Sequence, residues 1–283
     1  MQMSLHPFLQ SRQQSAAKRA SPRCAPAEPL HIRLVYGRTP DVLLHLDMQF
    51  DLLLTDPPYN SPRKSYFALP WQKHQNRDFG PWDAVENTDY SWLEPVVTRL
   101  LKKDSALLIF SPFERIGDYE DVLTALGCTY KTTIVWHKTN GVVHVPTYKS
   151  ACEAIIYAVK GRPFFRKWET QKGFAAHNYI RGPSCMGAER ARWGHPTQKP
   201  EYLIARLLHR HSQPGYWVLD PFMGVGTVPA VCWKMGRHCL GVEQDATYYQ
   251  RAAQRLQELG WAPPRPCADQ GDPSRPALTT AHP

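Results

Sequence analysis

Hydrophobic residues along this chain fall into short continuous runs that alternate with longer stretches of mixed polarity. Seven of the runs are rich in β-branched or aliphatic residues, a pattern typical of strands buried on both faces of a sheet. These predicted strands are Ile32–Tyr36, Asp51–Thr55, Ala106–Phe110, Thr133–Trp136, Ala154–Val159, Tyr216–Leu219 and Cys239–Val242.

Apolar residues recur three and four positions apart between several of these runs, which predicts amphipathic helices. The segments with this spacing are 91–102, 114–126, 200–210 and 246–259, and a further helix is expected to begin near Thr227. Strands and helices that alternate over most of a chain favour an α/β fold, with one open sheet and helices on both of its faces.

Both ends of the chain have the composition of disordered tails. Residues 1–28 mix Ser, Gln, Pro and Ala with four basic residues and one acid, and residues 262–283 contain six Pro and almost no aliphatic side chains. Such segments bury too little apolar surface to fold. The acid-poor beginning also has features of an organelle transit peptide, but a basic tail that helps hold nucleic acid is the preferred interpretation. A single folded domain is therefore expected over 29–261.

Charge and cysteine content narrow the class of protein. The chain has 34 Lys and Arg against 25 Asp and Glu, a formal net charge of +9, which favours an anionic partner. Its apolar runs are all shorter than the roughly 18 residues of a transmembrane helix, so we expect no membrane span. The seven Cys form no C-x-x-C pair, so neither a metal site nor a disulfide framework is expected, and a reducing cytoplasm is the default location.

The first chemical motif follows the second predicted strand and consists of Asp56, Pro57, Pro58 and Tyr59. Two successive prolines fix the backbone and remove two N–H donors, which leaves a stiff turn whose carbonyls can accept hydrogen bonds. The Asp56 carboxylate and a proline carbonyl can accept the two hydrogens of a planar exocyclic amine, while Tyr59 stacks on its ring. A Pro-rich loop with a helix-capping Asp is the structural alternative.

The second motif follows the sixth predicted strand and comprises Asp220, Phe222, Gly224, Gly226 and Thr227. Glycines at 224 and 226 let the backbone approach a ligand closely, and the helix that begins near Thr227 directs free N–H groups into the same space. Glu243 ends the last strand, 19 residues after Gly224, where a carboxylate can accept bonds from ribose hydroxyls. Taken alone, this pattern fits a tight strand–helix turn equally well.

A third segment, 195–200, reads His-Pro-Thr-Gln-Lys-Pro and lies directly before a predicted helix. Taken alone it is a plain helix start, with Pro200 at the first helical position and Thr197 or Gln198 as the cap.

Together the three motifs resemble the β-class amino-methyltransferases of DNA, which use S-adenosylmethionine. In that family the base-binding turn comes first, followed by a target-recognition segment, the His-Pro-Thr-Gln-Lys-Pro segment and the glycine motif. Here these parts fall at 56–59, about 160–193, 195–200 and 220–227. The resemblance covers roughly 31–259. It implies a Rossmann-like methyltransferase sheet of seven mostly parallel strands, with an antiparallel hairpin at one edge and a small target-recognition insertion.

The resemblance assigns roles to individual residues. Asp56, Pro57, Pro58 and Tyr59 would form the catalytic site for a flipped-out base. The residues expected to bind S-adenosylmethionine are His195, Thr197, Gln198, Lys199, Asp220, Phe222, Gly224, Gly226, Thr227 and Glu243. Among these, Glu243 would hold the ribose, Asp220 the methionine amino group, and Thr197 and Lys199 the methionine end.

Double-stranded DNA is the expected partner. Residues 160–192 contain eight basic residues against two acids, and a second basic and aromatic segment follows the catalytic turn. An excess of positive charge with interleaved aromatic rings is typical of a nucleic-acid surface. The residues expected to contact DNA are Arg63, Lys64, Lys73, Arg77, Arg162, Arg166, Lys167, Lys172 and Arg181. A homodimer and a cognate restriction nuclease are further partners that the resemblance allows, in a bacterial or phage cytoplasm.

Methylation of adenine at N6 is the preferred activity, because in this family Asp at the first motif position favours adenine and Ser is commoner for cytosine. The alternatives are methylation of cytosine at N4, methylation of a protein glutamine amide, and a DNA-binding homologue that has lost catalysis. One departure bears on the cofactor. The family carries Gly-Asp after the first strand, where this chain has Gly37 and Arg38, with Asp41 as the nearest acid.

Overall fold

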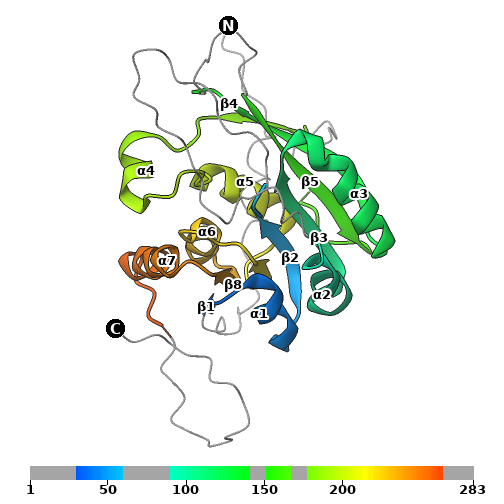
Figure 1. The fold of residues 1–283 in the computed structure, drawn as a ribbon, viewed down its shortest axis with the longest axis horizontal. Coiled ribbons are helices and arrows are strands. Elements are labelled where there is room, and N and C mark those ends of the chain that lie inside the picture. Colours follow the sequence, from blue (N-terminus) through cyan, green and yellow to red (C-terminus); the bar gives the residue numbers. More distant parts are fainter. Residues whose placement is uncertain (1–29, 60–89, 141–150, 167–176, 264–283) are drawn as a thin grey trace, which may run out of the picture.

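All seven predicted strands lie side by side in one sheet of the computed structural model, which describes residues 30–59, 90–140, 151–166 and 177–263 (Figure 1). An eighth strand, β6, completes the sheet. The strands are β1 (Ile32–Tyr36), β2 (Phe50–Thr55), β3 (Leu101–Ser111), β4 (Thr129–Lys138), β5 (Cys152–Lys160), β6 (Tyr179–Gly182), β7 (Trp217–Asp220) and β8 (His238–Glu243). Their order is β1-β8-β7-β2-β3-β5-β4-β6.

The sheet is mostly parallel, as predicted. The neighbours β1–β8, β8–β7, β7–β2, β2–β3 and β4–β6 run parallel, and only β3–β5 and β5–β4 are antiparallel. The predicted antiparallel pair is therefore present, but β6 pairs with β4 and takes the edge position. Sequence reasoning missed β6 because it has only four residues, of which Ile180 alone is buried.

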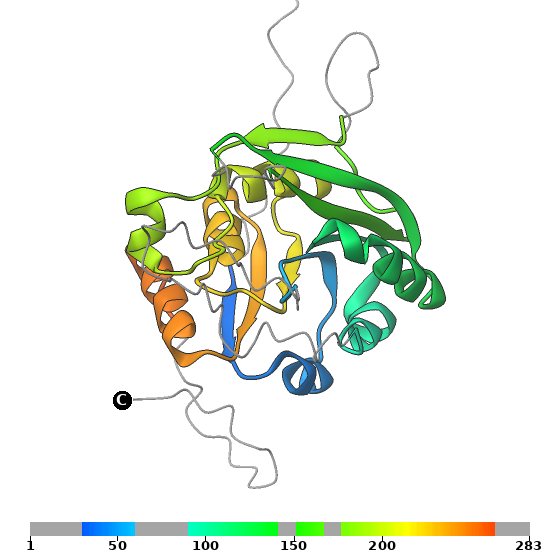
Figure 2. The same cartoon turned by 45° about the horizontal axis from the view of Figure 1, so that its top comes forward.

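Helices cover both faces of the sheet, as predicted (Figure 2). On one face α5, α6 and α7 pack on the side chains of Leu52 and Leu54, and on the other α1, α2, η4 and α3 pack on Leu53. The helices are α1 (Thr39–His45), α2 (Leu93–Pro95), the π-helical turn η4 (Val96–Leu100), the 3₁₀ turn η5 (Phe113–Arg115), α3 (Ile116–Ala125), α4 (Gly187–Trp193), α5 (Glu201–His211), α6 (Thr227–Met235) and α7 (Ala246–Glu258).

The predicted helix 91–102 is shorter than expected. The backbone N–H of Leu101 donates to the carbonyl of Val96, which widens the last turn, and β3 begins at the same residue. Helices α1 and α4 have seven residues each, too few for the periodicity to predict them.

Strands β2 and β7 are neighbours at the centre of the sheet, and the chain leaves them in opposite directions. From β2 it passes to β3 on one side, and from β7 through α6 to β8 on the other. Ligands of open α/β sheets bind at such a switch point, beyond the carboxyl ends of the strands. Within the described ranges, every helix is too short or too polar to cross a bilayer.

Candidate active site

The turns that follow β2 and β7 meet at this switch point. The hydroxyl of Thr55, the last residue of β2, donates to Oδ1 of Asp220, the last residue of β7, at 2.8 Å. The backbone N–H of Phe222 donates to the same oxygen at 3.3 Å. The structure thus brings together two motifs that lie 165 residues apart in the chain, as the sequence predicted.

Asp56 lies in a cluster of charges just beyond the end of β2. Its Oδ2 is 2.6 Å from Nζ of Lys199, and the same Nζ is 3.1 Å from Oε2 of Glu153. The other oxygen of Glu153 is 2.9 Å from Nζ of Lys138. The hydroxyl of Tyr59 donates to Glu153 at 3.2 Å and accepts from Lys199 at 3.3 Å. The Asp56–Tyr59 turn therefore contacts side chains of alternating negative and positive charge.

Burial and charge act in opposite directions on the carboxyls of this cluster. Burial raises the pKa of Asp56 above its usual range, although Lys199 opposes the change. Burial also acts to raise the pKa of Glu153, but Lys199 and Lys138 outweigh it and lower that pKa to about 2. Glu153 is therefore ionised at neutral pH, and Asp56 is the carboxyl of the cluster that binds a proton more readily.

One oxygen of Asp56 lacks a hydrogen-bond partner in the described part of the chain. Oδ1 is buried and has no hydrogen-bond partner among the described residues, whereas Oδ2 contacts Lys199. A buried acceptor without a partner is costly, so such an atom indicates a missing ligand group. An amine hydrogen would satisfy it.

Gly224 and Glu243 form the other wall of the site. The backbone N–H of Gly224 donates to Oε2 of Glu243 at 2.9 Å, and that of Asp245 donates to Oε1 at 2.7 Å. These bonds fix the carboxylate, and each oxygen keeps a lone pair for a further donor such as a hydroxyl. Gly224 has φ +53°, and a side chain there would meet the ring of His195 at 3.3 Å. Glycine at 224 therefore allows the His195 ring to lie close to this backbone.

Gly226 is required for a different reason from the one predicted. It has φ +73°, and a Cβ at this position would lie 2.8 Å from Cβ of Ala252 in α7. Glycine here lets the start of α6 pack closely on α7, rather than making room for a ligand. Thr227 begins α6 and its hydroxyl accepts from Arg255, so it too faces α7.

The 195–200 segment lies between the two motifs. His195 packs on Tyr248 with ring centroids 4.6 Å apart, and burial together with Lys199 lowers its pKa to about 4, so its ring is neutral at pH 7. Thr197 is exposed. The side-chain oxygen and nitrogen of Gln198 are both buried without a partner among the described residues. This amide is a second polar group that a ligand could satisfy.

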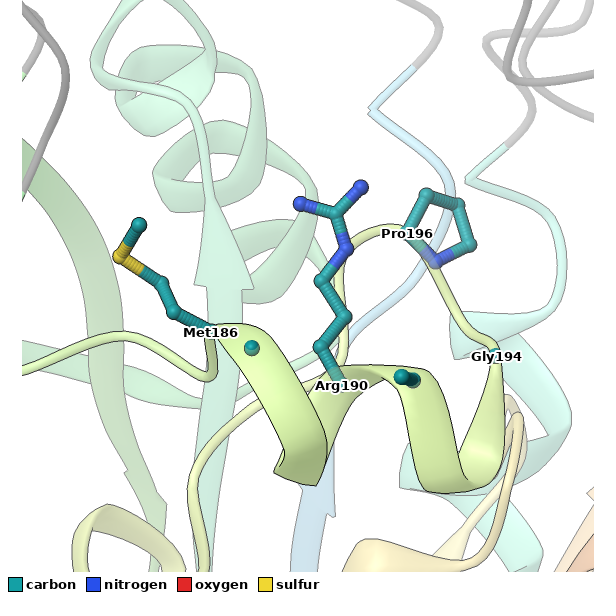
Figure 3. A pocket seen from close by; sticks show the side chains of 6 residues that line it. Met186, Arg190, Gly194 and Pro196 are labelled. Carbon is teal, nitrogen blue, oxygen red and sulfur yellow. The ribbon is translucent and has the colours of Figure 1, made fainter.

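A hollow of about 450 Å³ adjoins this segment (Figure 3). Figure 3 shows the side chain of Arg190 rising from α4 between Met186 and Pro196. The hollow is lined by Met186, Gly187, Arg190, Ala191, Gly194 and Pro196. Gly194 and Pro196 flank His195 in the chain, so the hollow is partly lined by the segment that contains the His-Pro-Thr-Gln-Lys-Pro motif.

The groups at the ends of β7 and β8 are of the kind that bind a nucleoside-containing cofactor. They are a fixed carboxylate at Glu243, a buried carboxyl at Asp220 and a glycine at 224. Lys199 Nζ contacts Asp56 and Glu153 in the structure. Its predicted contact with the methionine end of a cofactor stays a prediction.

Two residues of the cluster were missed as site residues. Lys138 ends β4 and Glu153 lies near the start of β5, opposite Trp136 in the sheet. A charged side chain at the end of an apolar strand is the signal that could have identified them. Their pairing with Lys199 depends on the long-range antiparallel register and so could not be predicted.

The predicted DNA-binding residues fall at different places. Arg181 lies on β6 opposite His137, at the end of β4 that carries Lys138. Lys160, at the end of β5, pairs with Ser105 near the start of β3. Arg162 and Arg166 follow Lys160, so they lie beyond the amino ends of the parallel strands, whereas Asp56 lies beyond the carboxyl ends. There Arg166 donates to the carbonyl of His209 at the end of α5. Six other predicted residues lie outside the described residues: Arg63, Lys64, Lys73, Arg77, Lys167 and Lys172. Most of both predicted tails lies outside them too.

The departure at Arg38 is confined to the surface. Arg38 forms an exposed ion pair with Asp41 at 3.8 Å. The backbone N–H of Gly37 donates to the carbonyl of Glu243 at 2.9 Å. The residue after β1 thus holds the Glu243 loop by a backbone hydrogen bond, which does not depend on the side chain at position 38.

Known proteins with similar sequences are DNA methyltransferases. The DNA methylase family of N6/N4 type matches residues 50–255. The Type II methyltransferase M.HpaI of Haemophilus parainfluenzae is 28% identical over an alignment of 246 positions, and the alignment covers 79% of this chain and 74% of that protein. M.HinfI of Haemophilus influenzae is 28% identical over an alignment of 233 positions. This alignment covers 74% of this chain but 63% of that relative, less than two thirds of its length.

Solved structures show the same fold. The complex of M1.HpyAVI with S-adenosylmethionine has a TM-score of 0.62 at 24% identity, covering 80% of this chain and 98% of that one. The PvuII DNA methyltransferase, described as cytosine-N4-specific, has a TM-score of 0.60 at 16% identity, covering 80% and 87%. With the family match over most of the chain, these likenesses show that the protein belongs to the N6/N4 DNA methylases, the S-adenosylmethionine-dependent amino-methyltransferases that its motifs resemble.

Proposed function

We propose that this protein transfers a methyl group from S-adenosylmethionine to N6 of an adenine that is flipped out of duplex DNA. The observation that carries the proposal is Oδ1 of Asp56, a buried acceptor that lacks a partner among the described residues and stands at the switch point of the sheet. Asp, rather than Ser, at this motif position favours adenine over cytosine by the family resemblance.

The catalytic turn would orient the amine and make it more nucleophilic. The lone pair of an adenine N6 is delocalised into the ring, so this nitrogen is a poor nucleophile. Asp56 Oδ1 and a carbonyl of Pro57 or Pro58 would accept its two hydrogens, which favours a tetrahedral nitrogen with a localised lone pair. The Asp56 carboxylate would stabilise the positive charge that develops on the nitrogen. It would then take up the proton that N6 loses, while the cofactor departs as the neutral thioether S-adenosylhomocysteine. Positioning of this kind can contribute roughly 7–11 kcal/mol to catalysis.

The cofactor supplies an electrophilic methyl group on a sulfonium. Glu243 would accept hydrogen bonds from its ribose hydroxyls, and the backbone at Gly224 would lie against it. Asp220 would hold the methionine amino group, since its Oδ1 is occupied by Thr55 and Phe222 and Oδ2 takes part in neither bond. The side chain of Gln198 would gain the partners that it lacks in the described part of the chain.

Cofactor affinity should depend on pH through Asp220. Burial raises the pKa of Asp220 to about 7. The cationic amino group binds the ionised carboxyl better, so affinity rises as pH rises toward that pKa. We expect the Kd for S-adenosylmethionine to fall by about 10-fold between roughly pH 5.5 and pH 7, with release of a proton. Calorimetry in buffers of different ionisation enthalpy measures both quantities.

Asp220→Asn is the control for this pH dependence, because an amide does not titrate. The pKa of His195, about 4, lies below the range. A wild-type Kd that is the same at both ends of the range would contradict the role of Asp220 in binding the amino group.

A duplex hides the adenine amine, so the base has to leave the stack at a cost of a few kcal/mol, and Tyr59 would offset part of it by stacking. Among the predicted DNA-binding residues that the structure describes, Arg181 lies at the same end of the sheet as Asp56. We expect Arg181→Gln to reduce the slope of log affinity against log salt by about one, as for one lost phosphate contact. Arg166→Gln, at the opposite edge, should leave the slope unchanged; equal slopes for both variants would place the DNA elsewhere.

The proposed function is tested by sequencing DNA from cells that express the protein, with a method that reports N6-methyladenine and N4-methylcytosine separately. The proposal expects methyladenine within one short sequence context and no signal from a strain without the gene. Methylcytosine would establish the cytosine alternative, and unmodified DNA would support a protein without DNA-methylating activity.

A further inference from the structure

We propose that Glu153 is a positioning residue for methyl transfer: it holds Lys199 and Tyr59 in place around Asp56 and balances the positive charge of Lys199. The inference rests on the proposed function and assigns a role to a side chain outside the three motifs.

The geometry places Glu153 at the centre of the cluster. Its Oε2 is 3.1 Å from Nζ of Lys199 and accepts from the Tyr59 hydroxyl at 3.2 Å. Its Oε1 is 2.9 Å from Nζ of Lys138. Both oxygens are thus engaged, and Glu153 is the residue that connects β5 to the catalytic turn and to the segment before α5. Movement of this carboxylate would displace both Lys199 and Tyr59.

Charge explains why a carboxylate is needed here. Methyl transfer places a positive charge on the amine beside Asp56, and a lysine 2.6 Å from Asp56 weakens the stabilisation that this carboxylate can give. The carboxylate of Glu153 compensates for Lys199. With Glu153 the four side chains Asp56, Lys199, Glu153 and Lys138 sum to zero charge, and without it they sum to +1. A net positive cluster opposes the developing cation.

A purely structural role accounts poorly for this arrangement. Lys199 is 7% exposed, Lys138 18% and Glu153 19%. Burying charges in this way seldom adds stability over an apolar core of the same size, because desolvation offsets the attraction between them. The cluster therefore indicates a functional requirement at the catalytic turn.

The test uses single-turnover methyl transfer to DNA by the full chain with labelled S-adenosylmethionine. Glu153→Gln keeps the shape of the side chain and can still accept from Tyr59, but leaves the cluster with a charge of +1. We expect its rate to fall by about 100-fold, the size of effect that misplacing a reacting group produces. The double variant Glu153→Gln/Lys138→Gln restores a net charge of zero. Its rate should be about 10-fold higher than that of Glu153→Gln, a difference of 1.36 kcal/mol in activation free energy.

Three comparisons separate the proposal from loss of folding. Glu258→Gln removes the acid of a surface ion pair with Arg192 and should leave the rate unchanged. Glu153→Asp keeps the charge on a shorter side chain and should retain more activity than Glu153→Gln. Circular dichroism at the assay temperature should show each variant folded, although removing one charge of a buried ion pair lowers the stability of Glu153→Gln. The Kd for S-adenosylmethionine should stay close to wild type, because Glu153 lies around Asp56 and not among the residues proposed to bind the cofactor.

A further readout does not need activity. In protein labelled with ¹³C at the aspartate carboxyls, with Asp56→Asn used for assignment, the titration midpoint of Asp56 should move to lower pH in Glu153→Gln, since Glu153 raises the pKa of Asp56. An unchanged rate in Glu153→Gln, a double variant no faster than the single one, or an unmoved midpoint would overturn the inference. If the wild type itself transfers no methyl group, the proposed function fails, and the midpoint still tests the coupling.

Discussion

Replacing Asp56 with alanine lowers the single-turnover rate of methyl transfer by about 100- to 1000-fold, the usual effect of removing one preorganised group that stabilises transition-state charge. The variant loses both the acceptor at Oδ1 and the negative charge beside the amine. Lys199 keeps Glu153 as a counter-ion at 3.1 Å, so the cluster retains a paired lysine. Rapid-quench kinetics with labelled S-adenosylmethionine and adenine-containing duplex DNA measures the rate.

Cofactor affinity separates a catalytic effect from general damage. Asp56→Ala should bind S-adenosylmethionine as the wild type does, because the ribose and amino-group contacts are proposed for Glu243 and Asp220. Glu258→Ala is the control: it removes the carboxylate of a surface ion pair with Arg192 and should change neither rate nor affinity. Wild-type rates in Asp56→Ala would remove this carboxylate from the mechanism.

Replacing Lys199 with methionine reduces the free energy of unfolding by about 3 kcal/mol at neutral pH, as expected when one partner of a buried ion pair is removed. Asp56 then faces Glu153 without a cation between them, and burial already raises its pKa. A carboxyl with a raised pKa contributes instability that appears as pH rises through that pKa. The deficit should therefore be small in acid and largest at neutral pH.

Urea unfolding of the variant and the wild type across this pH range gives the difference directly. Lys234→Met provides the control, because Lys234 pairs with Glu201 at 2.6 Å on the surface, with 41% of its side chain exposed. Loss of this surface ion pair should lower the free energy of unfolding by less than about 1 kcal/mol, and the decrease should vary little with pH. A pH-independent deficit in Lys199→Met would show that packing, rather than charge, accounts for its stability effect.

The strands and the meeting of the two motifs could be predicted from the sequence because both follow from local patterns. Leu52, Leu53 and Leu54 are fully buried in β2, as a continuous apolar run predicts. The ends of parallel strands share one edge of a sheet, so the nearness of Asp56 and Asp220 followed from the α/β pattern. The three motifs gave the family without any knowledge of packing.

The pairing of side chains across the sheet could not be predicted. The ion pair of Lys199 with Asp56 depends on where α5 begins relative to β2, and that of Glu153 with Lys138 depends on the β4–β5 register. Charge counting also could not locate the basic residues after β5. Arg162 and Arg166 belong to the basic segment by composition, but the antiparallel direction of β5 carries them to the opposite edge.

The close packing of Gly226 on Ala252 lets helix α7 affect the shape of the turn that carries Gly224. The glycine turn is shaped from behind by α7, so a bulkier residue at 252 would push on the backbone that carries Gly224. On the ribosome the turns after β2 and β7 emerge before α7, which follows both in chain order. The turn that carries Gly224 and Gly226 is therefore supported only after α7 has been translated and has packed against it. A nascent chain should thus become able to bind the cofactor only late in synthesis.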